Sequence, residues 1–452
     1  MNTNSIRRSD RDSILQSLKA GVVPRRGLQY IQVGRAEEVK ALVQDVERIR
    51  DGGAAIRFII GEYGSGKTFL MQLVRSAALE QNLVTMHGDL APNRRLKSSQ
   101  GQARMLYAEL AKNLATRSKP EGGAMRSVVE RFVGSARKEA NRSDSETSQV
   151  IDERLNHFKE KVGGFAFAEV LNAYWEGYRD GDTAKKENAI RWLRGEYTTK
   201  TDARKDLGTR RYINDDNAYD YLKLFAQFVV ETGYDGLLVG LDEMVNLYQI
   251  SHSTARKGNY DQLLRIVNDC LQGSVEHLGF LMCGTPEFLT DTRTGLYSYE
   301  ALRSRLQENT FATEEHRDLT GPVIRLSSLT PEELYVLLGN LRSVHAGEKK
   351  EDYLVPDEAL EAFMERCSNQ VGEKYFKNPR ETVREFVNLI SILEQNPELE
   401  WQELIDDVSV RDEQENEALN HPSEDKEDSP QADEASSESD GDDGTELSSF
   451  EL

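Results

Sequence analysis

The sequence predicts an α/β protein with a parallel sheet core, a helical insertion and a C-terminal helical lid. Near residue 60 a buried strand, a glycine-rich turn and a helix follow one another, and near residue 240 a second apolar run ends in two acids. Lys67 and Asp242 are 175 positions apart, far more than one strand and helix need. The gap must therefore contain inserted structure.

The first strand is expected over residues 55–60, and "GEYGSGKT" follows at 61–68. This stretch fits G-x-x-x-x-G-K-[ST], in which backbone N–H groups surround phosphate oxygens, a lysine adds positive charge and a hydroxyl binds Mg²⁺. A helix is expected over 67–81. The predicted ATP-binding stretch consists of Gly61, Glu62, Tyr63, Gly64, Ser65, Gly66, Lys67, Thr68 and Phe69, with Thr68 also a metal ligand.

The insertion, residues 92–215, is expected to be largely helical, with helices over 101–117, 124–140 and 165–180. It holds 25 basic and 18 acidic residues in a chain of net charge −21. Between 185 and 212, Lys and Arg alternate with Trp192, Tyr197 and Tyr212. One interpretation is nucleic-acid binding, with cations on phosphates and aromatics stacked on bases. The other is a helical core containing Trp192 beneath a solvated basic face.

"GLLVGLDE", residues 236–243, is the continuous apolar run of a buried parallel strand. We expect Asp242 to support Mg²⁺ and Glu243 to orient and polarise a water molecule. A third strand, beginning at 278, stops at Thr285. Because ligands bind at the carboxyl ends of parallel strands, Thr285 is a candidate for the γ-phosphate, for capping the next helix, or for both.

After Gly321 we expect a short strand, "PVIRL", and lid helices near 331–343, 357–367 and 380–395. The predicted organisation is an N-terminal segment (1–54), a core in two pieces (55–91 and 216–328), the insertion (92–215), the lid (329–410) and an acidic tail (411–452).

The tail has 16 acidic and 2 basic residues and almost no aromatics, a composition that predicts disorder. We hypothesise that the tail competes with nucleic acid for the basic insertion. There are two alternatives: the tail only keeps the protein in solution, or Phe450 and Leu452 anchor it in a pocket of a partner protein.

Three scattered cysteines indicate neither a disulfide framework nor a zinc site. No apolar run reaches membrane-spanning length and no secretory signal is evident, so we expect a cytoplasmic protein without membrane association.

The order of these motifs, with "LRSRL" and "NPRE" following them, resembles an AAA+ ATPase of the initiator and transposon-regulator type. The resemblance implies a sensor role for Thr285 and Arg380, and an arginine finger at Arg305, with Arg303 as the alternative. "VGRAEEV" resembles the N-terminal box of this class and implies Gly34 and Arg35 near the adenine. Two alternatives stay open: "LRSRL" forms an exposed helix face, and Arg35 is an ordinary surface residue.

Longer stretches, including "GVVPRRGLQYIQVGR", "DLAPNRRL" and "GTPEFLTDTRTGLYSYEALRSRL", are similar to the ATP-binding proteins of bacterial BREX phage-exclusion systems. The similarity covers about residues 25–393 and implies a defence role beside a helicase-like partner. No N-K-x-D stretch occurs, which favours adenine over guanine. The sequence thus predicts an ATP- and Mg²⁺-dependent ATPase acting as a homo-oligomer on or near DNA. The alternative is a nucleotide-gated scaffold that recruits a helicase or nuclease.

Overall fold

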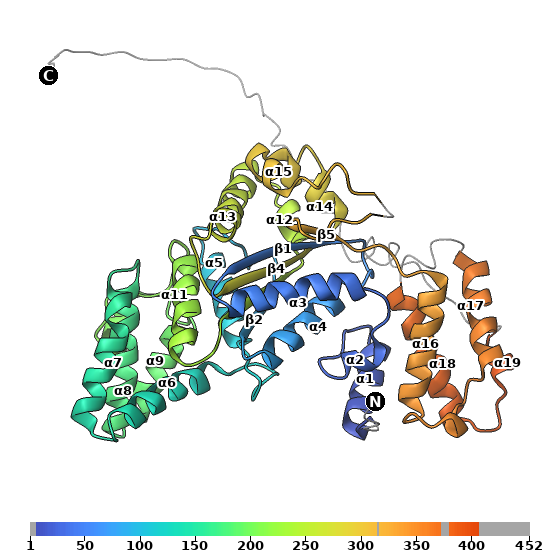
Figure 1. Cartoon of the computed structure of the whole chain (residues 1–452), viewed down its shortest axis with the longest axis horizontal. Helices are drawn as coiled ribbons and strands as arrows, with labels where there is room; N and C mark the ends of the chain where they lie inside the picture. The colour runs from blue at the N-terminus through green and yellow to red at the C-terminus, as the bar shows by residue number, and fades with distance from the viewer. Residues whose placement is uncertain (1–5, 314–315, 372–378, 406–452) are drawn as a thin grey trace, which may run out of the picture. The chain divides into compact units, whose positions relative to one another are not determined.

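A computed structural model describes residues 6–313, 316–371 and 379–405 (Figure 1). The described residues all belong to one compact unit. The acidic tail, residues 411–452, lies outside the described residues, so the hypotheses about it are not addressed by the structure. None of the described helices combines the length and the apolar character needed to cross a membrane.

The core is a sheet of five parallel strands in the order β2-β3-β4-β1-β5, which confirms the predicted α/β fold and is consistent with an AAA+ core. The strands are β1 (Ala54–Ile60), β2 (Val84–Asp89), β3 (Leu237–Asp242), β4 (Leu278–Gly284) and β5 (Val323–Arg325). In this order β4 lies between β1 and β3, so the glycine-rich turn after β1 and the acids after β3 emerge along the same edge. The sequence analysis did not predict β2.

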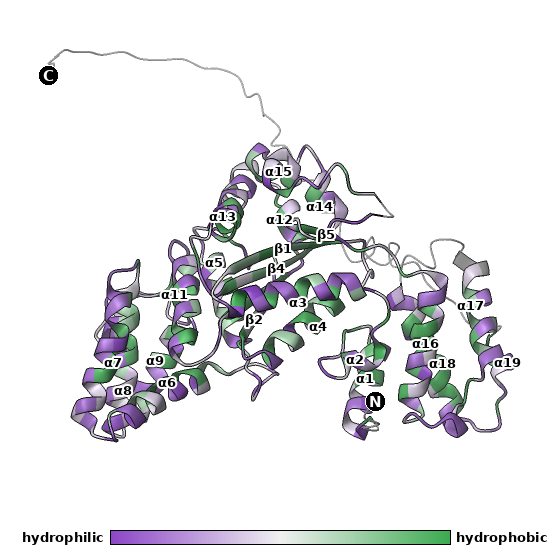
Figure 2. Cartoon of the chain, in the orientation of Figure 1, coloured by the Kyte–Doolittle hydropathy of each residue, from purple (hydrophilic) through white to green (hydrophobic). Residues whose placement is uncertain are grey.

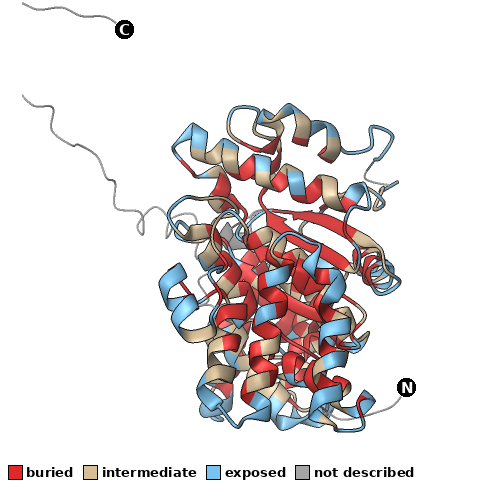
Figure 3. Cartoon of the chain, turned by 90° about the vertical axis from the view of Figure 1, so that its left-hand side faces the viewer, coloured by how far each residue is buried: buried red, intermediate tan, exposed pale blue. Residues whose placement is uncertain are grey.

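Helices cover both faces of the sheet, because alternate strand residues point to opposite sides. On one face, Ala55 and Ile59 of β1 pack against α3 (Ala36–Arg50) and α4 (Lys67–Glu80). On the other face, Ile56 and Phe58 join a core that extends continuously into the insertion helices. Figure 2 shows hydrophobic residues concentrated on the central strands, and Figure 3 shows the helices with buried inner and exposed outer faces.

The insertion is helical. The three helices predicted near 101–117, 124–140 and 165–180 are present, and three further helices, at residues 144–159, 183–193 and 200–207, were not predicted. In order, the helices of the insertion are α5 (Gln102–Lys112), α6 (Met125–Glu139), α7 (Asp144–Lys159), α8 (Gly164–Arg179), α9 (Thr183–Leu193) and α10 (Lys200–Leu207).

The stacking part of the nucleic-acid interpretation is wrong for two of its three aromatics. Trp192 is 1% exposed, and its indole N–H donates to the Arg211 carbonyl at 2.8 Å. Tyr197 is 3% exposed, with its hydroxyl bonded to Asp206 at 2.8 Å. These rings fill the insertion's core, so no base can stack on them.

Several helices lie between the insertion and β5, before and after β3 and β4. They are α11 (Ala218–Glu231), α12 (Val245–Tyr248), α13 (Ser253–Leu271), α14 (Pro286–Thr290), the 3₁₀ turn η1 (Leu296–Ser298) and α15 (Glu300–Leu306). The sequence analysis did not describe α13, which packs against α15. This group positions the segment that contains both arginine-finger candidates.

The lid helices pack with the N-terminal helices. The lid consists of α16 (Pro331–His345), the 3₁₀ turn η2 (Lys350–Asp352), α17 (Asp357–Val371), α18 (Pro379–Gln395) and α19 (Trp401–Ile405). The three longer helices match the three predicted ones. Ile14 of α1 (Arg8–Lys19) and Ile31 of α2 (Leu28–Ile31) share one hydrophobic cluster with Leu334, Leu338 and other lid residues. The N-terminal segment therefore reaches the sheet's edge together with the lid.

Candidate nucleotide site

The glycine-rich turn lies between β1 and the N-terminus of α4. Gly66 precedes α4 with φ of 89°, a left-handed backbone that glycine adopts without steric cost, and no side chain caps the helix there. The first N–H groups of α4 thus have no side-chain acceptor at the cap, as an anion-binding helix terminus requires. The Ser65 hydroxyl, also in this turn, is buried without a hydrogen-bond partner among the described residues.

Lys67 is folded back onto the turn. Its ammonium group donates to the carbonyls of Gly61 and Glu62, both at 2.8 Å. Burial lowers the pKa of Lys67, and the nearby Cys283, Asp242 and Glu243 oppose that shift. The lysine is therefore a partly desolvated cation held by weak neutral acceptors, which a phosphate group can replace.

The two acids after β3 both face the site because the backbone turns sharply between them. Asp242 accepts from the Thr68 hydroxyl at 2.6 Å and from the Glu243 N–H at 2.8 Å. Glu243 has φ of 55°, in the left-handed region that non-glycine residues seldom adopt. In a regular strand neighbouring side chains point to opposite faces. The turn at Glu243 instead brings both carboxylates to the same cavity.

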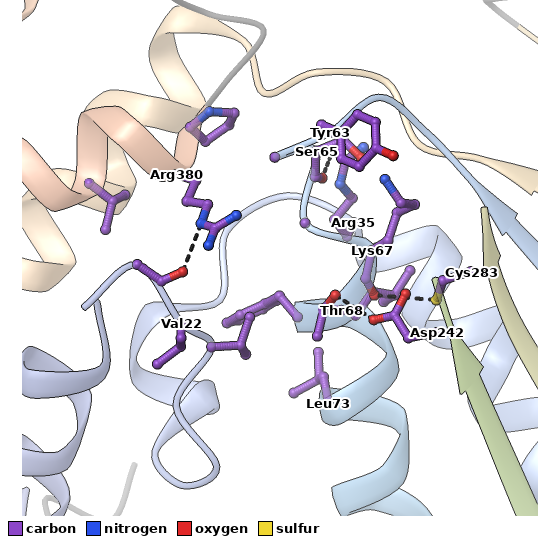
Figure 4. Close-up of a pocket in the computed structure, with 18 of the residues that line it drawn as sticks. Val22, Arg35, Tyr63, Ser65, Lys67, Thr68, Leu73, Asp242, Cys283 and Arg380 are labelled. Atoms are coloured by element: carbon purple, nitrogen blue, oxygen red, sulfur yellow. Dashed lines mark hydrogen bonds between the residues drawn. The ribbon is translucent and has the colours of Figure 1, made fainter. Parts of the chain in front are cut away.

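A cavity of about 420 Å³ lies between the turn, the strand ends, the N-terminal segment and the lid (Figure 4). Its polar end contains Lys67, Thr68, Asp242, Glu243 and Thr285. The rest of its wall is largely apolar and, apart from Phe69, was not predicted, because it forms only when distant segments pack together. The main apolar residues of that wall are Val22, Val23, Ile31, Val33, Phe69, Leu73, Leu337 and Val383.

Thr285 and Arg380 also line this cavity. Thr285 directly follows β4 and caps α14, because its hydroxyl accepts from the Phe288 N–H at 3.4 Å. The capping role considered from the sequence is therefore present, in a residue that is 3% exposed and faces the site. Arg380, at the start of α18, donates from Nε to the Gly21 carbonyl at 2.7 Å. Figure 4 shows its guanidinium extending toward the pocket from the lid side.

Arg35 lines the cavity, whereas Gly34 is not among the described residues that do. The Arg35 guanidinium donates to the Ser65 carbonyl at 3.5 Å and to the Ser327 side chain and carbonyl. It thereby connects the glycine-rich turn to the segment between β5 and α16. A Cβ at Gly34 would lie 2.5 Å from a carboxylate oxygen of Glu333 in α16, so this position is closely packed against the lid.

The two finger candidates lie away from the chain's own cavity, and neither is among the described residues that line it. Both are in the last turn of α15. Arg305 donates from Nε to Asn268 of α13 at 2.5 Å and from its guanidinium to the Ala301 carbonyl at 2.8 Å. Arg303 is exposed, so of the two it is the side chain that points to solvent.

Besides the apolar wall, two cavity residues with titratable side chains were given no role from the sequence. Asp89 ends β2 directly beside Asp242 of β3, and its pKa is raised, first by partial burial and then by the Asp242 charge. Cys283 of β4 is fully buried, which raises the pKa of its thiol well above the usual value. A strand ending in an acid, "MHGD", was the available signal for Asp89, but the strand itself was not recognised.

A family model described as BREX system ATP-binding protein BrxC/D matches residues 6–409. The chain belongs to the BrxC/D family. It is therefore an ATP-binding protein of the BREX anti-phage system, as the sequence resemblance implied. No curated protein matches the chain. The match of this BrxC/D family member spans all the described residues, including those that line the cavity.

The residues of the cavity fit a nucleotide with its metal ion. Among the described residues no cluster of three or more His, Cys, Asp or Glu side chains forms a complete metal cage. Mg²⁺ rarely uses such cages, because it keeps several waters and takes its other ligands from phosphates and one or two carboxylates. The side chains of Thr68 and Asp242, whose oxygens are 2.6 Å apart, would hold the Mg²⁺ ion.

Proposed function

We propose that this BrxC/D family member binds and hydrolyses ATP with Mg²⁺, as an oligomer that acts on or near DNA beside a helicase-like partner. The observation that carries the proposal is the convergence of Lys67 and Thr68, from the start of α4, with Asp242 and Glu243, from the end of β3, on one cavity. A structural lysine or a solvated pair of acids would not need to share a cavity with the free N-terminus of α4.

Each residue has a role that follows from its chemistry. Lys67 exchanges two neutral carbonyl acceptors for phosphate oxygens, which are stronger, charge-assisted partners. Thr68 and Asp242 hold the metal, which neutralises phosphate charge when bound. Glu243 orients the attacking water and accepts its proton, while Thr285 and Arg380 stabilise charge on the terminal phosphate.

The apolar wall of the cavity suits a purine ring. Val22 and Ile31 of the N-terminal segment, Phe69 of α4 and Val383 of α18 surround the space beyond the polar end. An aromatic base buried against such side chains gains hydrophobic and dispersion stabilisation. Because residues from the lid and from the N-terminal segment form this wall together, base binding is expected to hold both against the core.

Two variants separate binding from hydrolysis. Lys67→Ala should weaken ATP binding at least tenfold, because it removes the phosphate counter-charge. Glu243→Gln should bind ATP as wild type does and reduce turnover by about 10²-fold or more, because a general base contributes roughly that much. Fluorescent-nucleotide titration and phosphate release check both. Turnover by Glu243→Gln at the wild-type rate would remove Glu243 from the mechanism.

The oligomer part of the proposal depends on α15. If a neighbouring subunit's site receives Arg303 or Arg305, replacing that arginine by Ala should preserve ATP binding and abolish hydrolysis. Mixing the inactive variant with Lys67→Ala should restore part of the activity, since one subunit supplies the arginine and the other an intact cavity. Testing Arg303→Ala and Arg305→Ala in parallel identifies the donor, because Arg305 is already bonded to Asn268. Full activity of both variants, or a strict monomer with ATP and DNA, would contradict the shared site.

A nucleotide-gated scaffold is the second candidate. The lid and the N-terminal segment both contribute to the wall of the cavity, and Arg380 bridges them through the Gly21 carbonyl. ATP binding alone can therefore change the position of the lid without hydrolysis. Steady-state turnover with and without duplex DNA separates the candidates: stimulation by DNA supports the ATPase, whereas negligible turnover with tight ATP binding supports the scaffold.

A further inference from the structure

Five exposed cations occupy the twelve positions from Lys200 to Arg211. None of their side chains forms an ion pair or hydrogen bond within the described part of the chain. We call these side chains the α10 patch: Lys200, Arg204, Lys205, Arg210 and Arg211. Five cations in so short a segment of an acidic chain repel one another, so the arrangement costs free energy unless an anion offsets it.

The fold holds this patch outward through ordinary helix signals. Thr199 caps α10, because its hydroxyl accepts from the Asp202 N–H at 3.1 Å. Ala203 is fully buried and Leu207 packs against the insertion core, which fixes the inner face of the helix. Gly208 ends α10 with φ of 75°. The basic side chains are consequently displayed on a short helix and on the turn that follows it.

The acids of the same segment do not neutralise the patch. The Asp202 carboxylate accepts from the Thr199 hydroxyl at 2.6 Å, and Asp206 accepts from Tyr197 and lies 3.9 Å from Arg191. Elsewhere in the insertion, cations commonly have carboxylate partners: Arg126 pairs with Glu187, Arg154 with Glu139 and Lys185 with Glu176. The α10 patch is therefore a local excess of positive charge.

The chemistry of the patch favours a phosphate backbone over exposed bases. Binding of single strands depends largely on aromatic platforms, and Trp192 and Tyr197 beside the patch are buried. Lys and Arg without exposed aromatics provide contacts to the regularly spaced phosphates of a duplex, which carry no sequence information.

We propose that the α10 patch binds the phosphate backbone of duplex DNA without reading its sequence. This inference rests on the proposed action on or near DNA and assigns it to a surface. Five phosphate contacts predict that log K falls with log salt at a slope of about −4 to −5, because each contact contributes about −0.9.

The experiment compares two full-length variants with equal charge changes. The test variant combines Lys200→Gln, Arg204→Gln and Lys205→Gln; the control combines Lys112→Gln, Lys138→Gln and Arg142→Gln, which are exposed insertion cations outside the patch. Binding of a labelled 30-bp duplex is measured by anisotropy across salt concentrations. The test variant should bind at least about tenfold more weakly at low salt, with a slope flattened by about 3, and the control should resemble wild type.

Other measurements make the outcome decisive. ATP binding and DNA-free turnover should be unchanged in both variants, and two duplexes of different sequence should bind wild type equally. An unchanged slope in the test variant would overturn the assignment while leaving DNA action open, whereas a wild type that binds no duplex would overturn both and leave the ATPase. Tighter binding of a single strand, or equal binding of polyglutamate with the same slope, would overturn the duplex as occupant.

Discussion

Asp89 and Asp242 end neighbouring parallel strands in register, and both line the candidate nucleotide cavity. Asp242 is bonded to Thr68 and to the Glu243 N–H, whereas the Asp89 side chain has no hydrogen bond or ion pair among the described residues. Two carboxylates on adjacent strands repel each other and also repel nucleotide phosphates. A divalent cation relieves both repulsions. Asp89 should therefore make ATP binding more dependent on Mg²⁺.

The variant Asp89→Asn tests this role through measurements of ATP binding, without measuring hydrolysis. Without Mg²⁺ the variant should bind ATP at least as tightly as wild type, because a negative charge near the phosphates is lost. The Mg²⁺ concentration for half-maximal ATP binding should rise roughly 3- to 10-fold, since one of the charges that attract the metal is missing. Glu109→Gln is the control, because Glu109 pairs with Arg94 and is not among the described residues of the cavity. The same Mg²⁺ requirement in Asp89→Asn and wild type would exclude the role.

At the residue scale, local patterns predicted the residues at the polar end of the candidate site and little of its apolar wall. Lys67 and Thr68 follow a turn whose glycines allow only a few backbone arrangements, and Asp242 ends a strand that its apolar run identifies. The left-handed turn at Glu243 has no signal in the sequence, since non-glycine residues seldom adopt it. Val22 and Val383 face one cavity only through tertiary packing. No local pattern contains that information.

At the element scale, α1 connects the lid to the cavity. Ile14 of α1 is fully buried in the cluster shared with the lid, and the chain that follows supplies Leu18, Gly21 and Val22 to the cavity wall. Ile14 also lies against Gly27, where a Cβ would be 2.5 Å from its Cδ1. The position of this wall therefore depends on the packing of one helix against α16 and α18.

Ile14→Ala should lower the free energy of unfolding by about 2–4 kcal/mol, as removal of a fully buried branched side chain does. It should also weaken ATP binding several-fold, because the loosened α1 no longer holds the apolar wall in place. Leu155→Ala in α7, equally buried but in the insertion, should destabilise similarly without changing ATP affinity. Urea unfolding and nucleotide titration provide the comparison. Equal ATP affinities in the two variants would argue against the coupling.

The elements that sequence reasoning found are those with a continuous apolar run or a long helical period. The runs before Asp242 and Thr285 predicted β3 and β4, and the lid helices match their predicted ranges. β2 contains Thr85, His87 and Asp89 among its six residues, which interrupts the apolar run of a buried strand. Backbone pairing nevertheless holds the strand on both edges: Thr85 bonds through its backbone to Ala115, and β3 pairs along the other edge. That pairing is tertiary and has no local signature.

At the scale of the whole molecule, charge is distributed unevenly along the chain. The 16 acids and 2 bases of residues 411–452 give that segment −14, whereas the insertion holds an excess of seven bases. The α10 patch concentrates five of the insertion's cations on one short surface. A polyanion joined to the same chain reaches a high effective concentration at any cationic site that it can span. Self-competition between the segment and DNA is the expected consequence.

Removal of residues 411–452 should therefore tighten duplex binding at low salt, by roughly tenfold, and the gain should shrink as salt screens the competing carboxylates. The same deletion in the Lys200→Gln, Arg204→Gln, Lys205→Gln variant should have a smaller effect, because the cations for which DNA and the segment compete are missing. A full-length protein with the 411–452 sequence scrambled should behave as wild type if charge alone acts. Anisotropy titrations at two salt concentrations measure all five proteins: wild type, its truncated form, the triple variant with and without the segment, and the scrambled chain. Equal duplex binding by the truncated and full-length chains at low salt would disprove self-competition.

The functional use left for the segment would then be docking to a partner protein through Phe450. Replacing Phe450 with Ala in a partner-binding assay tests that role.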